Sequence, residues 1–94
     1  MPRYNERPAF PFGCVYITSG ANEKLLADDV VDGLLRHLNG DWGDVCEEDW
    51  NENQLSLKRG FRLLSSYVDR NNHRYWIITE ADRSATTILL PSEY

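Results

Sequence analysis

The sequence predicts an α+β domain in which an N-terminal strand and two to three short helices pack on a C-terminal three-stranded antiparallel β-meander. Three observations lead to this fold class. Apolar residues recur at three-and-four spacing in the first half of the chain, and side chains alternate with a period of two after Gly60. Clusters of turn-forming residues at 69–72 and 81–84 separate the alternating stretches. The 94 residues provide for one domain, placed at 14–94, behind an irregular arm at 1–13.

The arm is expected to be irregular because it contains three prolines and shows no periodicity. After it, β-branched and aromatic side chains at 14–18 indicate a short strand. A short helix is then expected at 20–27, with either Thr18 or Ser19 as its N-cap.

Two longer helices follow in the prediction. The first begins at Asp28 or Asp29 and ends at Asn39, because its apolar residues form one buried stripe. The second covers about 45–59, and three acidic residues fall in its first turn, where the helix dipole favours anions. Asp44 and Glu47 have the spacing of a capping box for this helix. Its predicted end is marked by Lys58, Arg59 and Gly60.

Three strands are predicted after Gly60, at 61–68, 74–80 and 85–90. Short turns join them, so antiparallel neighbours are expected, and the sheet consists either of these three strands alone or of these three extended by the N-terminal strand. Ile77 and Ile78 point to opposite faces of the central strand, and we expect only one of the two to be buried.

The net charge of −5 is concentrated in one segment. Residues 41–52 hold six acidic and no basic side chains, while the remaining chain holds nine acidic and ten basic ones. The sequence pI near 4.8 argues against direct binding to nucleic acid, which requires clustered Lys and Arg, and favours a protein partner with a basic surface. There is neither a membrane-length apolar run nor a signal-peptide pattern, so no membrane association and a cytoplasmic location are expected. Cys14 and Cys46 are expected to be reduced, partly buried thiols.

The acidic segment is the first candidate site, a protein-binding surface that meets a basic partner. The alternative is that its acids serve only helix capping and solubility. Trp42 is either an exposed interface anchor or a buried lid over the helix layer, and Trp50 is expected to be partly exposed. The candidate residues are Asp41, Trp42, Asp44, Glu48, Asp49, Trp50 and Glu52.

The turn after the central strand is the second candidate surface, because it brings two acids, an arginine and a hydroxyl into five residues. These are Glu80, Asp82, Arg83 and Ser84. The turn is either part of a small enzyme or ligand-binding site or purely structural. In the structural alternative, Asp82 and Ser84 bond turn amides while Arg83 pairs with a neighbouring carboxylate.

Three stretches resemble a family of small uncharacterised bacterial proteins described as plasmid-related: HLNGDWGDVCEED, GFRLLSSY and WIITEADRSATTILLPSEY. The resemblance covers roughly residues 14–94. Trp50 and Gln54 depart from it, since lysine and glutamate are expected there. The first motif is matched by His37, Gly40, Asp41, Trp42, Gly43, Asp44, Glu48, Asp49 and Asn53, and the second by Ile78, Thr79, Glu80, Ala81, Asp82, Arg83 and Ser84. Members of that family lie frequently on mobile elements, which implies an accessory role. The resemblance supplies no catalytic residues that could be assigned to positions of this sequence.

Together these observations favour a non-enzymatic, acidic protein-binding module of a mobile genetic element. An acidic face that imitates the charge of DNA would suit inhibition of a host nucleic-acid-handling or defence complex. Two alternatives stay open: a small enzyme or ligand-binding protein that uses the turn from Glu80 to Ser84, and a structural homodimer. No cofactor is expected. No metal is expected either, because the acids lack calcium-loop spacing and the two histidines have no neighbouring ligands.

Overall fold

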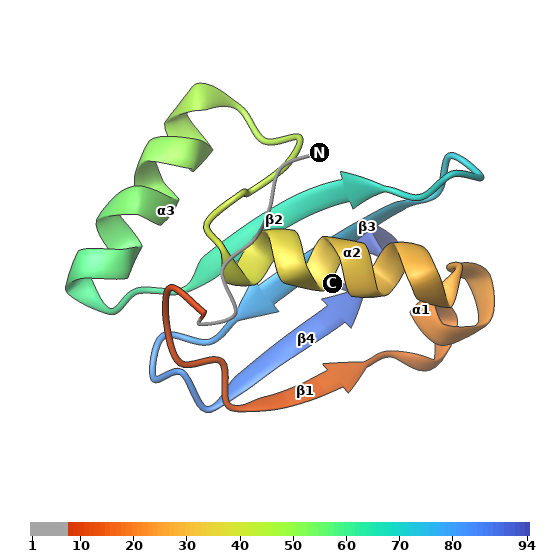
Figure 1. Cartoon of the computed structure of the whole chain (residues 1–94), viewed down its shortest axis with the longest axis horizontal. Helices are drawn as coiled ribbons and strands as arrows, with labels where there is room; N and C mark the ends of the chain where they lie inside the picture. The colour runs from red at the N-terminus through yellow and green to blue at the C-terminus, as the bar shows by residue number, and fades with distance from the viewer. Residues whose placement is uncertain (1–7) are drawn as a thin grey trace.

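The computed structural model describes residues 8–94, so residues 1–7 of the predicted arm lie outside the described part. Its elements are β1 (Cys14–Ile17), α1 (Ser19–Lys24), α2 (Ala27–Leu38), α3 (Glu47–Arg59), β2 (Leu63–Val68), β3 (Arg74–Thr79), β4 (Ala85–Leu89) and the 3-10 turn η1 (Pro91–Glu93). The predicted mixed α+β class is confirmed. Figure 1 shows α2 lying across one face of the sheet, with α3 standing beside the β2 edge.

The sheet has four strands in the order β1-β4-β3-β2 and is mixed, so the predicted three-stranded meander is wrong as a description of it. β2, β3 and β4 pair antiparallel, whereas β1 lies parallel to β4. The Cys14 amide donates to the Ser84 carbonyl and the Thr18 amide to the Ile88 carbonyl, both at 3.0 Å. This pairing joins segments about 70 residues apart, which is why no local pattern in the sequence indicates it.

Two of the predicted helix ends are confirmed, but α1 ends at Lys24 instead of 27, and α2 begins after the N-cap Leu26 instead of at Asp28 or Asp29. Thr18 caps α1 by accepting a hydrogen bond from the Ala21 amide, and Gly60 ends α3 with φ of 75°. The predicted capping box of α3 is wrong. Cys46 is the N-cap, without a side-chain bond, and the Asp44 carboxylate pairs instead with Arg74 at 2.9 Å. Asp44 therefore pairs with Arg74, which is distant in sequence, instead of capping the adjacent helix.

The main hydrophobic core lies between the sheet and the layer formed by α1 and α2. It contains Ala21, Leu25, Tyr67, Tyr75, Ile77 and Ile88. α2 approaches the sheet closely at Gly33, because a Cβ atom there would lie 2.2 Å from the Tyr75 hydroxyl oxygen. That hydroxyl donates to the Asp29 carbonyl at 2.9 Å. The absence of a side chain at Gly33 thus permits this contact between helix and strand.

The second face of the sheet is partly covered as well. Ile77 and Ile78 are both buried, so the expectation that only one of them would be buried is wrong. Ile78 lies between Leu64 and Thr87 on the neighbouring strands. On the same face the Tyr94 ring meets the Trp76 ring edge-on, with the centroids 5.6 Å apart. The C-terminal segment therefore acts as a small second cover, which strand periodicity does not reveal.

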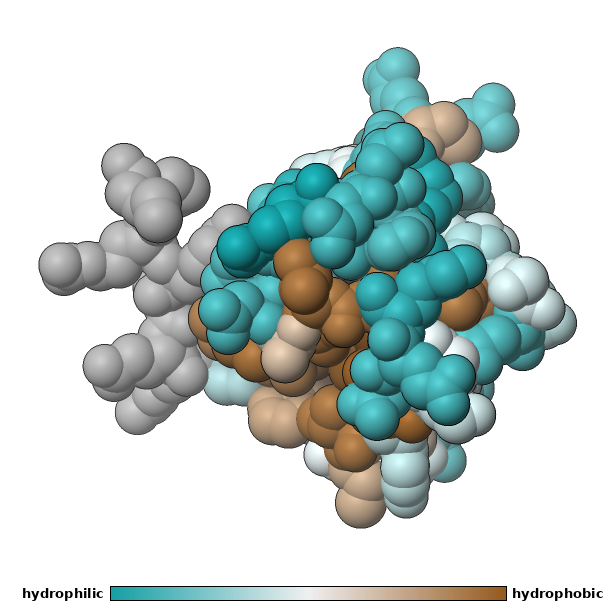
Figure 2. Space-filling view, turned by 90° about the vertical axis from the view of Figure 1, so that its right-hand side faces the viewer, coloured by the Kyte–Doolittle hydropathy of each residue, from teal (hydrophilic) through white to brown (hydrophobic). Residues whose placement is uncertain are grey.

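Apolar side chains also reach the surface at the end of the molecule that carries α1. Figure 2 looks onto this end and shows them surrounded by hydrophilic residues. A shallow depression there is lined by Leu26, Ala27, Asp28 and Arg70.

Both cysteines are exposed free thiols, so the prediction of partly buried thiols is wrong. Cys14 lies on the outermost strand, and Cys46 lies at the N-cap of α3. Their positions at a sheet border and a helix end account for the exposure. Among the described helices, none is long and apolar enough to cross a membrane.

The outer edge of β2 is closed by the chain itself. The Asn53 side chain accepts a hydrogen bond from the Leu64 amide at 3.1 Å and donates to the Leu64 carbonyl at 2.7 Å. The neighbouring peptide groups of Ser66 bond to the Trp42 carbonyl and the Asp44 amide. Asn53 thus takes the place of one residue of an added strand and fixes α3 to the sheet.

We expect Asn53→Ala to lower the free energy of unfolding by about 1–3 kcal/mol, because two backbone groups of Leu64 lose their partner. Asn51→Ala, at an exposed position of the same helix, should change it by no more than about 0.5 kcal/mol. Urea unfolding followed by circular dichroism measures both values. Equal losses in the two variants would contradict the role assigned to Asn53.

Candidate functional site

Five exposed carboxylates gather at the start of α3 and in the loop before it, and we call them the acidic face. They are Asp44, Glu47, Glu48, Asp49 and Glu52. Asp44 pairs with Arg74, but its side chain is 72% exposed, so this contact stabilises the fold little. For the other four, residues 8–94 supply no ion pair. Their charges are therefore available to a partner.

Asp41 has a structural role, unlike the acidic face. Its carboxylate accepts hydrogen bonds from the Arg36 guanidinium at 2.8 and 3.3 Å and from the Gly43 amide at 3.2 Å. The ion pair is about two-thirds buried on both sides. Asp41 therefore holds the turn that leads from α2 to α3 and is not part of the acidic face.

Trp42 is the buried lid of the two alternatives, since its side chain is fully buried. The indole N–H donates to Gln54 Oε1 at 2.9 Å, and the ring stacks on Phe10 with the centroids 6.2 Å apart. An interface anchor needs an accessible ring, so that alternative is wrong for Trp42. Trp50 is half-buried, as expected, and packs against the cluster that contains Trp42 and Leu63.

His37 is a buried group that sequence reasoning did not select as functional. Its Nδ1 lies 2.5 Å from Ser65 Oγ, and its Nε2 lies 2.9 Å from Thr79 Oγ1. The chain continues from Thr79 to Thr86 at 2.8 Å. Burial, together with the positive charge of Arg83, lowers the pKa of His37 to about 3. The imidazole is therefore neutral, and with no solvent exposure it has a structural role.

The second candidate surface is a tight turn held by its own side chains. Asp82 Oδ1 accepts from the Ser84 amide at 3.0 Å, and hydrogen bonds from Ser84 hold the pKa of the Asp82 carboxyl below its usual value. The predicted pairing of Arg83 with a carboxylate is wrong. The Arg83 guanidinium donates instead to the carbonyls of Phe61, Ser56 and Glu80 at 2.7–3.1 Å. The N–H groups of Arg83 thus bond to backbone carbonyls and not to a carboxylate. The side chain of Glu80 is exposed.

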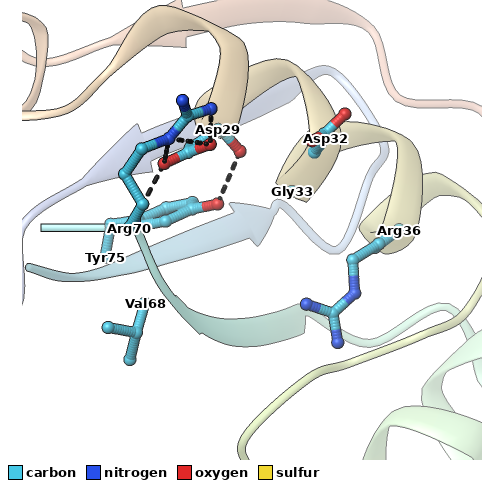
Figure 3. A pocket seen from close by; sticks show the side chains of 7 residues that line it. All are labelled: Asp29, Asp32, Gly33, Arg36, Val68, Arg70 and Tyr75. Atoms are coloured by element: carbon cyan, nitrogen blue, oxygen red, sulfur yellow. Dashed lines mark hydrogen bonds and ion pairs between the residues drawn. The ribbon is translucent and has the colours of Figure 1, made fainter. Parts of the chain in front are cut away.

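A pocket of about 240 Å³ lies between α2 and the β2–β3 hairpin. In Figure 3 the Arg70 side chain is directed onto Asp29, with the Tyr75 hydroxyl nearby, and Arg36 lies on the opposite side. The Arg70 guanidinium meets the Asp29 carboxylate at 2.8 Å, and these hydrogen bonds hold the pKa of that carboxyl below its usual value. Burial raises the pKa of Tyr75 to about 12. Asp29 and Arg70 are 41 positions apart, and no spacing in the sequence connects them.

No group of three or more His, Cys, Asp or Glu side chains suited to a metal ion occurs within residues 8–94. Comparison of the chain with protein-family models, with curated proteins and with solved structures finds no match. The candidate site therefore has to be judged from the chemistry of its own residues.

We expect the free energy of unfolding to fall as the pH falls from 6.5 toward 3, because unfolded His37 binds a proton that the folded protein does not. This contribution is complete above pH 6.5 and declines by up to about 1.4 kcal/mol per pH unit below it. Urea unfolding at about pH 7, 6 and 5 measures the slope, in a range above the ordinary pKa of the carboxyls.

His37→Gln should flatten the slope, because glutamine does not titrate. In the unmodified protein, the His37 ring signals in NMR spectra should not shift between about pH 7 and 5. Titration of these signals near pH 6.5 would show that the ring is open to solvent and would contradict the assignment.

Proposed function

We propose that the protein is a non-enzymatic binding module whose acidic face meets a basic surface on a partner protein. One observation supports this most directly. Glu47, Glu48, Asp49 and Glu52 are exposed on adjacent turns of one helix, with no basic side chain among residues 8–94 in an ion pair with them. Carboxylates arranged in this way attract a basic partner over roughly 8 Å at physiological ionic strength.

The position of α3 supports the same proposal. The helix stands at the border of the molecule beside β2 (Figure 1), so a partner can reach its outer surface. Asn53 and Trp42, which bonds to Gln54, hold it in place without using the exposed acids. The acidic face is thus displayed on a rigid support, which reduces the entropy lost on binding.

Capping accounts for only part of this charge. Glu47, Glu48 and Asp49 lie in the first turn, where anions stabilise the helix dipole. Glu52 lies beyond that turn, and Asp44 precedes the helix. A role in binding explains why all five remain together at the surface.

The resemblance to plasmid-related bacterial proteins suggests the biological setting. We propose that the protein belongs to a mobile genetic element and acts in the cytoplasm. Its acidic face would inhibit a host nucleic-acid-handling or defence complex by occupying a basic surface meant for DNA. Direct binding to nucleic acid and to membranes is not part of this proposal.

The test compares two triple variants that remove the same amount of charge. Glu48→Gln, Asp49→Asn and Glu52→Gln together should weaken partner capture from a bacterial lysate at least tenfold, because attraction between exposed charges is lost. Glu23→Gln, Asp28→Asn and Asp32→Asn together should leave capture within about twofold, since these exposed acids lie in α1 and α2. Quantitative mass spectrometry of the captured proteins measures both effects.

Raising the salt concentration to about 1 M should reduce capture by the unmodified protein, because the screening length falls to about 3 Å. The melting temperature of the acidic-face variant should change by only a few degrees, which separates lost binding from lost folding. Equal capture by both triple variants, at low and high salt, would contradict the proposal.

A further inference from the structure

The strand β1 forms an open edge of the sheet. Figure 1 shows it at the lower border of the molecule, with no other element on its outer side. Because the amides of Cys14 and Thr18 bond to carbonyls of the β4 segment, the peptide groups of Val15 and Ile17 point away from β4. Within residues 8–94 these outward groups have no hydrogen-bond partner. They are available to another strand.

The two edges of the sheet differ in protection. On β2, Asn53 and the backbone of 42–44 occupy the outward groups. β1 is protected only by its shortness, since its four residues include no proline, no lysine and no bulge. The side chains of Val15, Tyr16 and Ile17 are apolar or aromatic and 41–55% exposed. This edge therefore combines unpaired backbone groups with exposed apolar surface.

The charge distribution favours a second copy of the chain as the occupant. No charged residue occurs at 8–22, which includes β1, or at 84–92, which includes β4. The Glu93 carboxylate lies at the end of β1, where it accepts hydrogen bonds from Thr18 and Gly20, and not at Tyr16 in the middle of the strand. Two molecules with a net charge of −5 can thus approach along 15–17 with no charged residue in either strand. The two outward residues are also placed symmetrically about Tyr16, so the edge is complementary to itself under a twofold axis.

We propose that the protein dimerises by antiparallel pairing of β1 with β1 of a second copy, with the twofold axis at Tyr16. Val15 and Ile17 of one copy form hydrogen-bonded pairs with Ile17 and Val15 of the other. The two Tyr16 residues face each other as a non-hydrogen-bonded pair, with Cα atoms about 4.5 Å apart. The two four-stranded sheets become one continuous sheet. The acidic faces lie at the far edges, beside β2, and stay accessible.

The first test is the mass in solution, measured by analytical ultracentrifugation between about 10 µM and 1 mM, because an interface of short strands is small. The expected mass is twice 10.9 kDa at the upper concentrations. Tyr16→Lys should be monomeric, because two ammonium groups would meet at the axis. Val31→Lys, at an exposed apolar position of α2, should leave the dimer intact.

Val15→Pro is a second disrupting variant. It removes an outward N–H and leaves the amides that bond to β4 in place, a position that sheets tolerate for proline at an edge. It should be monomeric with folded circular dichroism spectra. A monomeric mass for the unmodified protein at 1 mM, or a dimer that survives Tyr16→Lys, would overturn the proposal. If the protein is monomeric and an extended peptide of another protein binds along β1, the edge serves strand addition by that protein, and the dimer proposal is wrong.

The second test reads the register by disulfide formation in a background carrying Cys14→Ser and Cys46→Ser. Tyr16→Cys should cross-link readily on mild oxidation, because a Cα separation of about 4.5 Å lies within the range of disulfides. Val15→Cys should cross-link at least tenfold more slowly, since its two copies would be about 8 Å apart. Non-reducing electrophoresis measures both rates. Faster linkage of Val15→Cys would overturn the proposed register.

Discussion

The fold depends on satisfying one buried imidazole. His37 on α2 bonds through one ring nitrogen to Ser65 on β2 and through the other to Thr79 on β3. Thr79 bonds in turn to Thr86 on β4, whose hydroxyl donates to the Phe12 carbonyl at 2.8 Å. A buried polar group without a partner costs about 1–3 kcal/mol, so the helix, three strands and the described part of the arm must meet in one arrangement. No buried side-chain polar atom within the described residues lacks a partner.

Around this polar chain, aromatic rings exclude water and position the acidic face. The rings of Phe10 and Trp42 meet the His37 ring edge-on, with centroids 5.4 and 5.6 Å away. Trp42 also begins the segment 42–44, whose backbone bonds to Ser66 at the outer edge of β2. Its indole N–H donates to Gln54 on α3. α3 is thereby fixed to Trp42, whose carbonyl in turn accepts a hydrogen bond from the Ser66 amide of β2. The acidic face then occupies a defined surface, and only Asp44 of its five residues is in an ion pair within residues 8–94.

The two edges of the sheet have different properties and are suited to different contacts. The β2 edge is covered by the chain itself and carries α3, so it is stable and displays charge. The β1 edge is uncovered, uncharged and apolar, which suits contact with a second copy of the chain. In the proposed dimer, two acidic faces would stand at opposite ends of one long sheet. A partner with two basic surfaces would then bind with increased effective concentration, provided that its sites match this span.

The sequence by itself determined the features that depend on neighbours in the chain. The period change after Gly60, the turn at 69–72 and the exposed acids of α3 were predictable, because propensity and periodicity act over a few residues. The predicted buried stripe of α2 is wrong at Val31 and Leu35, which are exposed. Tertiary structure decided the remainder. The pairing of β1 with β4, the choice of Arg74 over a cap for Asp44, the carbonyl partners of Arg83 and the burial of Trp42 all depend on residues distant in sequence. Hydrogen-bond partners that are distant in sequence compete successfully with local ones when burial removes water as an alternative partner. A local sequence pattern does not show which distant residue will lie there.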